Sequence, residues 1–337
     1  MSNEPCSFNK ENLNAVDLMK FVMSIVVVAM HTEPMRNCTY NALLEIYNVF
    51  SGAVVPFFFL ASGYLLGKKL THTENDIAFV STKIKSSMYL YVFWSFVYFP
   101  LAASFSYANN PDSTVFQFIF YYVKGFFLVG TNYNSWQLWY LLATIYGLLF
   151  VRRCLKRNKS IKRITILGFC IISISYWIDT FVAYNYPLPV FAGVIQRLFQ
   201  TTIMEGRLLR SFFYIPMGML LSQKKLSMRT SLVLTVAGFA VDYFSGGLTS
   251  AYAHMAMCVG IFSTVSCIKL PDSPVYRTLR SWSTDMYFMH MWVWTVYYTM
   301  VFGTKTFGID SFVVTVIACI LISICKNKLN SWQKAGA

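Results

Sequence analysis

Polar side chains inside a long apolar run raise the first question about this chain. The segment AVDLMKFVMSIVVVAMH carries Asp17 and Lys20 near its start and His31 at its far end. In a helix, Asp17 and Lys20 share a face and can neutralise each other. His31 follows after nearly a whole number of turns, on about the same face and roughly 16 Å further along. These residues predict a polar stripe that lines a passage or an active-site cavity.

His31 has the chemistry of a general base. Imidazole titrates near neutral pH and has one nitrogen available to take a hydroxyl proton. Glu33 is close by in sequence and is a candidate to orient the ring. Two structural interpretations stay open. Asp17 and Lys20 can form a plain ion pair near the inner interface, and His31 can be an interfacial histidine near the lipid headgroups.

Other polar residues occur at the ends of apolar runs or inside them. Arg207 and Arg210 open one run, share a helical face, and predict a site for an anionic or polar extracytoplasmic substrate. Pairing of these arginines with Glu205 or with lipid phosphate is the alternative. His290 lies inside a later run and is expected to point into the helix bundle or toward tyrosines. Asp242 lies near an outer helix end, where we expect it to be solvated.

A group of lysines follows the second apolar run. The stretch VVPFFFLASGYLLGKKL contains Ser62 next to a glycine, which permits close helix packing, and ends in Lys68 and Lys69. Lys83 and Lys85 follow shortly after. The four lysines are either ordinary cytoplasmic charges or a phosphate-binding patch for a nucleotide-containing donor.

The composition identifies the class of protein. The chain of 337 residues is 56% hydrophobic and only 12% charged, which is about half the charged fraction of soluble proteins. The net charge of +14 lies in short clusters between apolar runs, as in cytoplasmic loops of membrane proteins, and does not indicate nucleic acid. The eight cysteines have no metal-binding spacing, and no metal site is expected. Residues 1–12 and the run after them do not fit a cleaved signal peptide.

The apolar runs and the charged loops between them predict the topology. The runs are 13–32, 46–66, 87–106, 113–130, 135–151, 164–183, 208–222, 230–244, 249–268, 283–303 and 309–325. Loop 152–163, with seven Lys/Arg, and the loop after the second run are both expected in the cytoplasm. Three runs lie between these loops, but an even number of crossings is required. Run 113–130, rich in Phe and Tyr with Lys124 inside it, is best explained as an outer-face interfacial or re-entrant helix.

Ten crossings remain, and both termini are then cytoplasmic. This topology assigns 21 of the 28 Lys/Arg to the inside. We therefore expect an all-α integral membrane protein in which residues 1–337 form a single membrane domain. Residues 1–12 would be a cytoplasmic N-terminal segment and residues 326–337 a cytoplasmic tail.

Five segments, in chain order, resemble the acyltransferase-3 family of bacterial integral membrane acyltransferases. They are AVDLMKFVMSIVVVAMH, VPFFFLASGYLLGKK, SWQLWYLLATIYGLLF, SFFYIPMGMLL and STDMYFMHMWV. The first departs from the family by having Lys20 where the family has arginine, and lysine cannot copy the bidentate fork of arginine. The branch that these segments resemble includes the membrane domain of the membrane serine racemases of vancomycin-resistance clusters.

The resemblance implies transfer of an acyl group, usually acetyl from acetyl-CoA, to a hydroxyl of a cell-surface glycan or small molecule. It implies that His31 is catalytic, with Lys20 at the place of an essential arginine and Asp17 beside it. It also implies that Lys68, Lys69 and their neighbours meet the donor. Residues assigned to the acceptor or its cavity are Glu33, Ser62, Trp139, Arg207, Arg210 and His290. The donor is a substrate, and no bound cofactor is expected.

A transporter of a small polar solute such as serine, or of a polysaccharide, is the alternative function. Transporters with a site at the middle of the membrane often contain paired repeats with broken helices, and the sequence has no clear internal repeat. The expected location is the bacterial cytoplasmic membrane. The expected partners are acyl-CoA, the acceptor and the lipid bilayer, and the sequence leaves open whether copies of the chain associate.

Overall fold

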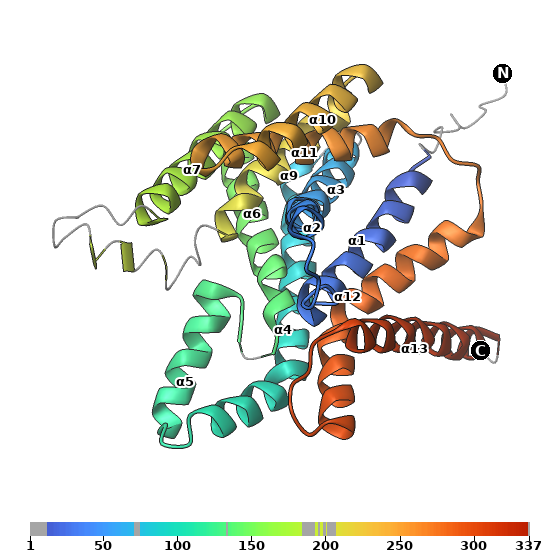
Figure 1. The fold of residues 1–337 in the computed structure, drawn as a ribbon. Helices are drawn as coiled ribbons and strands as arrows, with labels where there is room; N and C mark the ends of the chain where they lie inside the picture. Colours follow the sequence, from blue (N-terminus) through green and yellow to red (C-terminus); the bar gives the residue numbers. More distant parts are fainter. Residues whose placement is uncertain are drawn as a thin grey trace.

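The computed structural model describes residues 12–70, 75–132, 134–183 and 207–335, together with 193–194, 196–197 and 200. Within these residues every regular element is a helix (Figure 1). The α-helices are α1 (Asn14–Thr32), α2 (Asn41–Gly52), α3 (Val54–Leu70), α4 (Asp76–Asn109), α5 (Val115–Lys124), α6 (Trp139–Lys156), α7 (Ile161–Ala183), α9 (Arg210–Gln223), α10 (Met228–Phe244), α11 (Gly247–Cys267), α12 (Pro274–Val301) and α13 (Ile309–Ala335). Three short elements join them: the π-helix η1 (Gly125–Val129) and the 3₁₀ turns η2 (Trp136–Leu138) and η4 (Arg207–Leu209).

Seven helical segments of the described chain are long and apolar enough to cross a membrane, so the chain is a multi-pass membrane protein. They are Asn14–Thr32, Asn41–Leu70, Asp76–Asn109, Trp136–Lys156, Ile161–Thr180, Gly247–Cys267 and Ile309–Ser331. Helices also form at the three other predicted crossings. Of these, α9 and α10 have 14 and 17 residues, and α12 carries several charged and polar residues. The count of ten crossings and the cytoplasmic termini stay predictions.

Glycines bring α3 and α9 into backbone contact at the centre of the bundle. A Cβ atom on Gly63 would lie 2.0 Å from the carbonyl oxygen of Ile215, and one on Gly218 would lie 2.2 Å from the carbonyl oxygen of Leu60. No larger side chain fits at such separations. Close packing of small residues is a main source of helix association in membranes, where burial of apolar surface gives little advantage over lipid.

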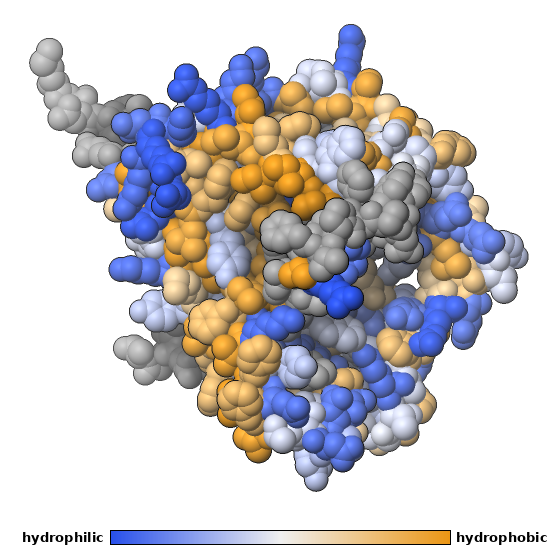
Figure 2. Space-filling view, turned by 90° about the vertical axis from the view of Figure 1, so that its left-hand side faces the viewer, coloured by the Kyte–Doolittle hydropathy of each residue, from blue (hydrophilic) through white to orange (hydrophobic). Residues whose placement is uncertain are grey.

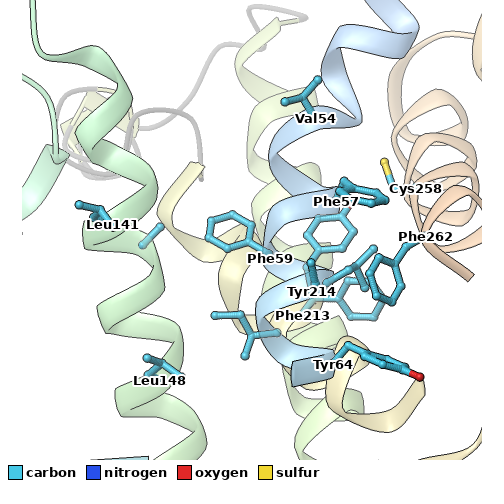
Figure 3. Packing of buried hydrophobic residues seen from close by; sticks show 14 of the residues in the cluster. Val54, Phe57, Phe59, Tyr64, Leu141, Leu148, Phe213, Tyr214, Cys258 and Phe262 are labelled. Atoms are coloured by element: carbon cyan, nitrogen blue, oxygen red, sulfur yellow. The ribbon is translucent and has the colours of Figure 1, made fainter. Parts of the chain in front are cut away.

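Aromatic side chains fill the space around this helix pair (Figure 3). Phe57 and Tyr64 of α3 both contact the ring of Phe262 in α11, with centroids 5.5 Å apart in each case. Phe59 packs against Tyr140 of α6 at 4.7 Å. These contacts join α3, α6, α9 and α11 into one hydrophobic core.

The segment 115–129 runs back along the outer half of α4. Tyr122 donates to the carbonyl oxygen of Ser95 at 3.0 Å, and Tyr91 donates to that of Phe126 at 2.7 Å. Helix α5 has no buried residue and stands apart from the bundle beside the lower part of α4 in Figure 1. The 15 residues are fewer than the roughly 20 of a typical crossing, so the outer-face interfacial or re-entrant helix stays the prediction for this segment.

The outer surface has the distribution expected of a protein in lipid. On the face shown in Figure 2, apolar side chains cover much of the surface and most hydrophilic ones gather toward its margins. Exposed apolar residues of the long helix α4 include Tyr89, Phe93 and Phe96, which are 57–78% exposed. In a bilayer these side chains face hydrocarbon or the interface, so their exposure needs no protein partner.

An interfacial or re-entrant position of residues 115–129 predicts the labelling of two engineered cysteines. Asn109→Cys, at the end of α4, and Asn132→Cys, after η1, should both react with an impermeant maleimide added outside cells whose native cysteines are replaced. Lys159→Cys, in the basic loop, should react only after permeabilisation. Labelling of Asn109→Cys and Asn132→Cys from opposite sides would mean that residues 115–129 cross the membrane.

Candidate active site

His31 lies at the end of α1, where two other rings meet it. The imidazole of His290 in α12 stacks on it with centroids 5.2 Å apart, and the Trp136 ring of η2 lies 5.9 Å away. Within the described residues neither nitrogen of His31 has a hydrogen-bond partner in the protein. The ring is therefore held by packing, and both nitrogens are available to a substrate.

The His290 ring is anchored in the protein. Nδ1 lies 2.9 Å from the carbonyl oxygen of Met286 one turn earlier, so Nδ1 carries the proton and donates it. His290 is fully buried, and Nε2 is without a partner in the described part of the chain. The hydrogen bond fixes the plane of the His290 ring, and the stacked His31 ring takes its orientation from that plane.

Helix α1 ends directly after His31. Glu33 adopts a left-handed conformation, with φ 48°, and its N–H donates to the carbonyl oxygen of Ala29. The carboxylate of Glu33 lies 3.8 Å from Arg36. The described residues show no contact between Glu33 and His31, so the predicted orienting role of Glu33 has no geometric support.

A cavity of about 460 Å³ opens beside His31, and we call it the His31 cavity. Elements that are distant in sequence build its walls: α1, the α2–α3 junction, η2 and α6, η4 and α9, and α12. Polar and aromatic side chains among its lining residues are His31, Trp136, Trp139, Tyr140, Arg207 and Arg210. The volume falls within the range of about 300–1,000 Å³ that is typical of small-molecule sites.

Hydrogen bonds hold the aromatic wall of this cavity. Ser62 and the hydroxyl of Tyr140 are 3.0 Å apart, so Ser62 contacts the cavity wall although it does not line it. The ring of Tyr140 packs against Tyr287 at 5.7 Å, and the hydroxyl of Tyr287 donates to the carbonyl oxygen of Gln137. Ser62 thus positions a lining residue, whereas Trp139 lines the cavity itself.

Lys305 packs over Trp136, one of the residues lining the His31 cavity, and could not be singled out from the sequence. Its ammonium lies 4.4 Å from the Trp136 ring centroid and 4.8 Å from that of Trp294. Burial lowers the pKa of this ammonium from its ordinary value, and Glu33 partly opposes the shift. The loop that carries Lys305 is tied to α1 by a 2.9 Å hydrogen bond from Gly308 to the carbonyl oxygen of Thr32. The sequence around Lys305 contains no pattern that predicts its contact with Trp136, the ring that packs against His31.

The inner end of α1 carries a charge cluster. Asp17 lies 3.9 Å from Lys20 and 3.6 Å from Arg280 of α12. Ser283, one turn beyond Arg280, donates to the carbonyl oxygen of Lys20 at 3.0 Å. The predicted Asp17–Lys20 pair therefore exists, and the structure adds Arg280 to it. A cavity of about 510 Å³ adjoins this cluster and is also lined by Arg277.

The four lysines of the predicted donor patch lie at the α3–α4 junction. The ammonium groups of Lys69 and Lys83 lie 5.8 Å and 5.6 Å from the same ring, that of Phe79. Lys68 packs over Tyr64 at 5.6 Å, and Lys85 is exposed. Lys69 and Lys83 therefore share a ring, and both ammonium groups lie close to the end of α3.

The charge cluster predicts a specific pattern of stability. Lys20→Ala should cost little, because Arg280 still neutralises Asp17. The double variant Lys20→Ala/Arg280→Ala leaves a carboxylate that is 11% exposed without a cation, and a loss on the order of 3–5 kcal/mol is expected. Adding Asp17→Asn should restore most of it. Thermal unfolding in detergent measures all three, and a double variant as stable as wild type would show that solvent or lipid neutralises Asp17.

Comparison with known proteins adds three findings. A family model described as an acyltransferase domain matches residues 13–327. Two curated proteins from Enterococcus faecalis, each named amino-acid racemase, are 29% identical over 153 residues and 27% identical over 172 residues. These matches cover 44% and 51% of this chain but only 20% and 22% of the relatives, so the chain spans about a fifth of their length. No solved structure matches the chain.

Proposed function

Because the chain belongs to the acyltransferase-3 family of membrane acyltransferases, as the domain match over residues 13–327 shows, we propose that it transfers an acyl group across the bilayer. The donor is a cytoplasmic acyl-CoA, with acetyl-CoA as the first choice. The acceptor is a hydroxyl of a cell-surface glycan or of another extracytoplasmic molecule. The bacterial cytoplasmic membrane is the location that brings both substrates to one protein.

The observation that carries this proposal is His31 in its cavity. His31 has two nitrogens without hydrogen-bond partners among the described residues, a ring oriented by His290, and two arginines, Arg207 and Arg210, lining the same cavity. A nitrogen of His31 takes the proton of the acceptor hydroxyl as the oxygen attacks the thioester carbonyl. The carbon–sulfur bond then breaks, and His31 returns the proton to the departing thiolate of coenzyme A, so the base is regenerated. Transfer thus needs one base and no metal ligand set.

The donor has cationic groups on the cytoplasmic side to bind it. The lysines at the α3–α4 junction are suited to the phosphates of the coenzyme, because ammonium groups at a wet helix end bind phosphate as point charges. The pantetheine arm extends inward along α1, past Lys20, and presents the thioester to His31. The distance of roughly 16 Å along α1 is compatible with the reach of a long flexible arm.

A second candidate is transport of a small polar solute, and the names of the curated relatives suggest an amino acid as that solute. Those proteins are named amino-acid racemases, and this chain matches only a fifth of each. A solute transporter has no reason to bind acyl-CoA. Binding of acetyl-CoA to the purified protein therefore separates the two functions.

Replacement of His31 tests the reaction. His31→Ala should lower acyl transfer by on the order of 10²–10⁴, the usual contribution of a general base, while insertion and donor binding persist. His31→Gln keeps hydrogen bonding but cannot titrate near neutral pH, so it should be nearly as inactive. Transfer is measured with radiolabelled acetyl-CoA in membranes that contain the natural acceptor.

An asparagine outside the site provides the control. Asn41→Leu, on α2, changes a residue that does not line the His31 cavity and should leave transfer close to the wild-type level. Near-normal transfer by His31→Gln would rule out proton abstraction by His31, and the transporter candidate would then be favoured.

Replacement of the junction lysines tests the donor site. Lys68→Gln/Lys69→Gln should weaken acetyl-CoA binding several-fold without loss of fold, because the charged groups lie at a helix end. The matched control is Lys224→Gln/Lys225→Gln, which removes the same charge from another predicted cytoplasmic loop. Calorimetric titration measures both. Equal affinity of the two double variants for acetyl-CoA would mean that Lys68 and Lys69 only help to orient the helix in the membrane and do not bind the donor.

A further inference from the structure

A second cavity, of about 450 Å³, lies between α2, α7, α9, α10 and α11. We call it the Asp242 cavity. Asp242 was expected to be solvated, and this expectation is wrong. Its side chain is 8% exposed and accepts a 2.5 Å hydrogen bond from Ser250, and its other oxygen lies 2.7 Å from Nδ1 of His254. The sequence did not reveal this because Asp242 and His254 belong to different helices.

The two cavities adjoin each other. Gly52 and Arg210 line both of them. Gly52 lies against the His254 ring so closely that a Cβ atom there would be 2.7 Å from Cε1. A larger residue at position 52 would therefore displace the His254 ring, which lines the Asp242 cavity.

The charges that line the Asp242 cavity are balanced. Asp242 and Glu45 supply two carboxylates, and Arg210 and the Asp242-bound His254 supply cationic or proton-donating groups. An ionic ligand would meet charges of both signs and gain little net attraction. A neutral ligand with several hydroxyl groups can both donate to carboxylates and accept from arginine and histidine.

The remaining lining residues fit the same kind of ligand. Tyr176, Tyr214 and Tyr243 offer ring surfaces and hydroxyl groups, and Asn48 offers an amide that both donates and accepts. Aromatic surface combined with a few positioned polar groups is the usual make-up of a site that binds a polar organic molecule. The carboxylate of Asp242 is already oriented before any ligand arrives, which reduces the entropy lost on binding.

We infer that the Asp242 cavity is a second acceptor subsite, which holds a neutral polyhydroxyl unit next to the unit acylated at His31. This inference rests on the proposed function. Each cavity alone has the volume of a small-molecule site, and together they accommodate two consecutive units of a glycan. The preferred acceptor is therefore an oligomer, and a single sugar binds with only part of the available contacts.

Binding to a protein that cannot turn over tests the subsite separately from the reaction. The probes are single sugars and longer fragments of the de-esterified surface glycan of the producing cell, titrated into His31→Ala protein. The longer fragments should bind at least tenfold more tightly than the single sugars. Asn48→Leu or Asp242→Asn, added to His31→Ala, should remove most of this difference, since each loses hydrogen bonds worth up to about tenfold in affinity.

Asn41→Leu is the matched control. Asn41 is an exposed asparagine on the same helix, α2, and it does not line the cavity. The Asn41→Leu substitution should leave the preference of the protein for longer glycan fragments unchanged. Asn48 is exposed, so Asn48→Leu removes no contact between helices, and thermal unfolding in detergent checks that Asp242→Asn, which keeps the shape of the side chain, also keeps the fold.

The possible results separate this inference from the proposed function. Equal affinity for single sugars and longer fragments, or an equal loss for Asn41→Leu and Asn48→Leu, would overturn the subsite. Tight, Asn48-dependent binding of longer fragments would support the subsite even if the wild-type protein transferred no acyl group. In that case only the proposed reaction would fail.

Discussion

The cost of placing charge in hydrocarbon governs the arrangement of this protein. A carboxylate inside a membrane needs a cation or hydrogen-bond donors close by, because no water is available to solvate it. Each of three carboxylates within the helices has such partners on another helix. Asp17 contacts Lys20 and Arg280, Asp242 contacts Ser250 and His254, and Asp285 contacts Ser323 and Lys326. These pairings join α1 to α12, α10 to α11 and α12 to α13, so satisfying the charges also selects which helices are neighbours.

His31 differs from these groups in having no hydrogen-bond partner among the described residues. The neighbouring His290 donates its Nδ1–H to the carbonyl oxygen of Met286 in its own helix, and it contacts His31 only through the face of its ring. The arrangement keeps a reactive nitrogen available at a cavity whose walls come from five parts of the chain. Close approach of α3 and α9 through Gly63 and Gly218 brings Arg210 of α9 into those walls together with Val55 and Phe58 of α3, because any larger residue would separate the two helices.

Much of the site could be predicted from the sequence, because polar residues in apolar runs are costly and therefore conspicuous. His31, Trp139, Arg207 and Arg210 were expected together, and all line one cavity. The neighbouring pair Asp242 and His254 escaped notice. The partners are 12 residues apart on two helices, and only the packing of α10 against α11 brings them together.

The sequence by itself determined the class of the protein, the positions of its helices and the chemical types of its reactive groups. These follow from local properties: the length of an apolar run, the charge of a loop and the cost of a buried polar side chain. The tertiary structure decided which helices meet. It stacked His290 on His31, brought Arg280 to Asp17, set Lys305 over Trp136, and placed a second cavity beside the first. Such contacts depend on crossing angles and glycine positions in partner helices, which no single segment encodes.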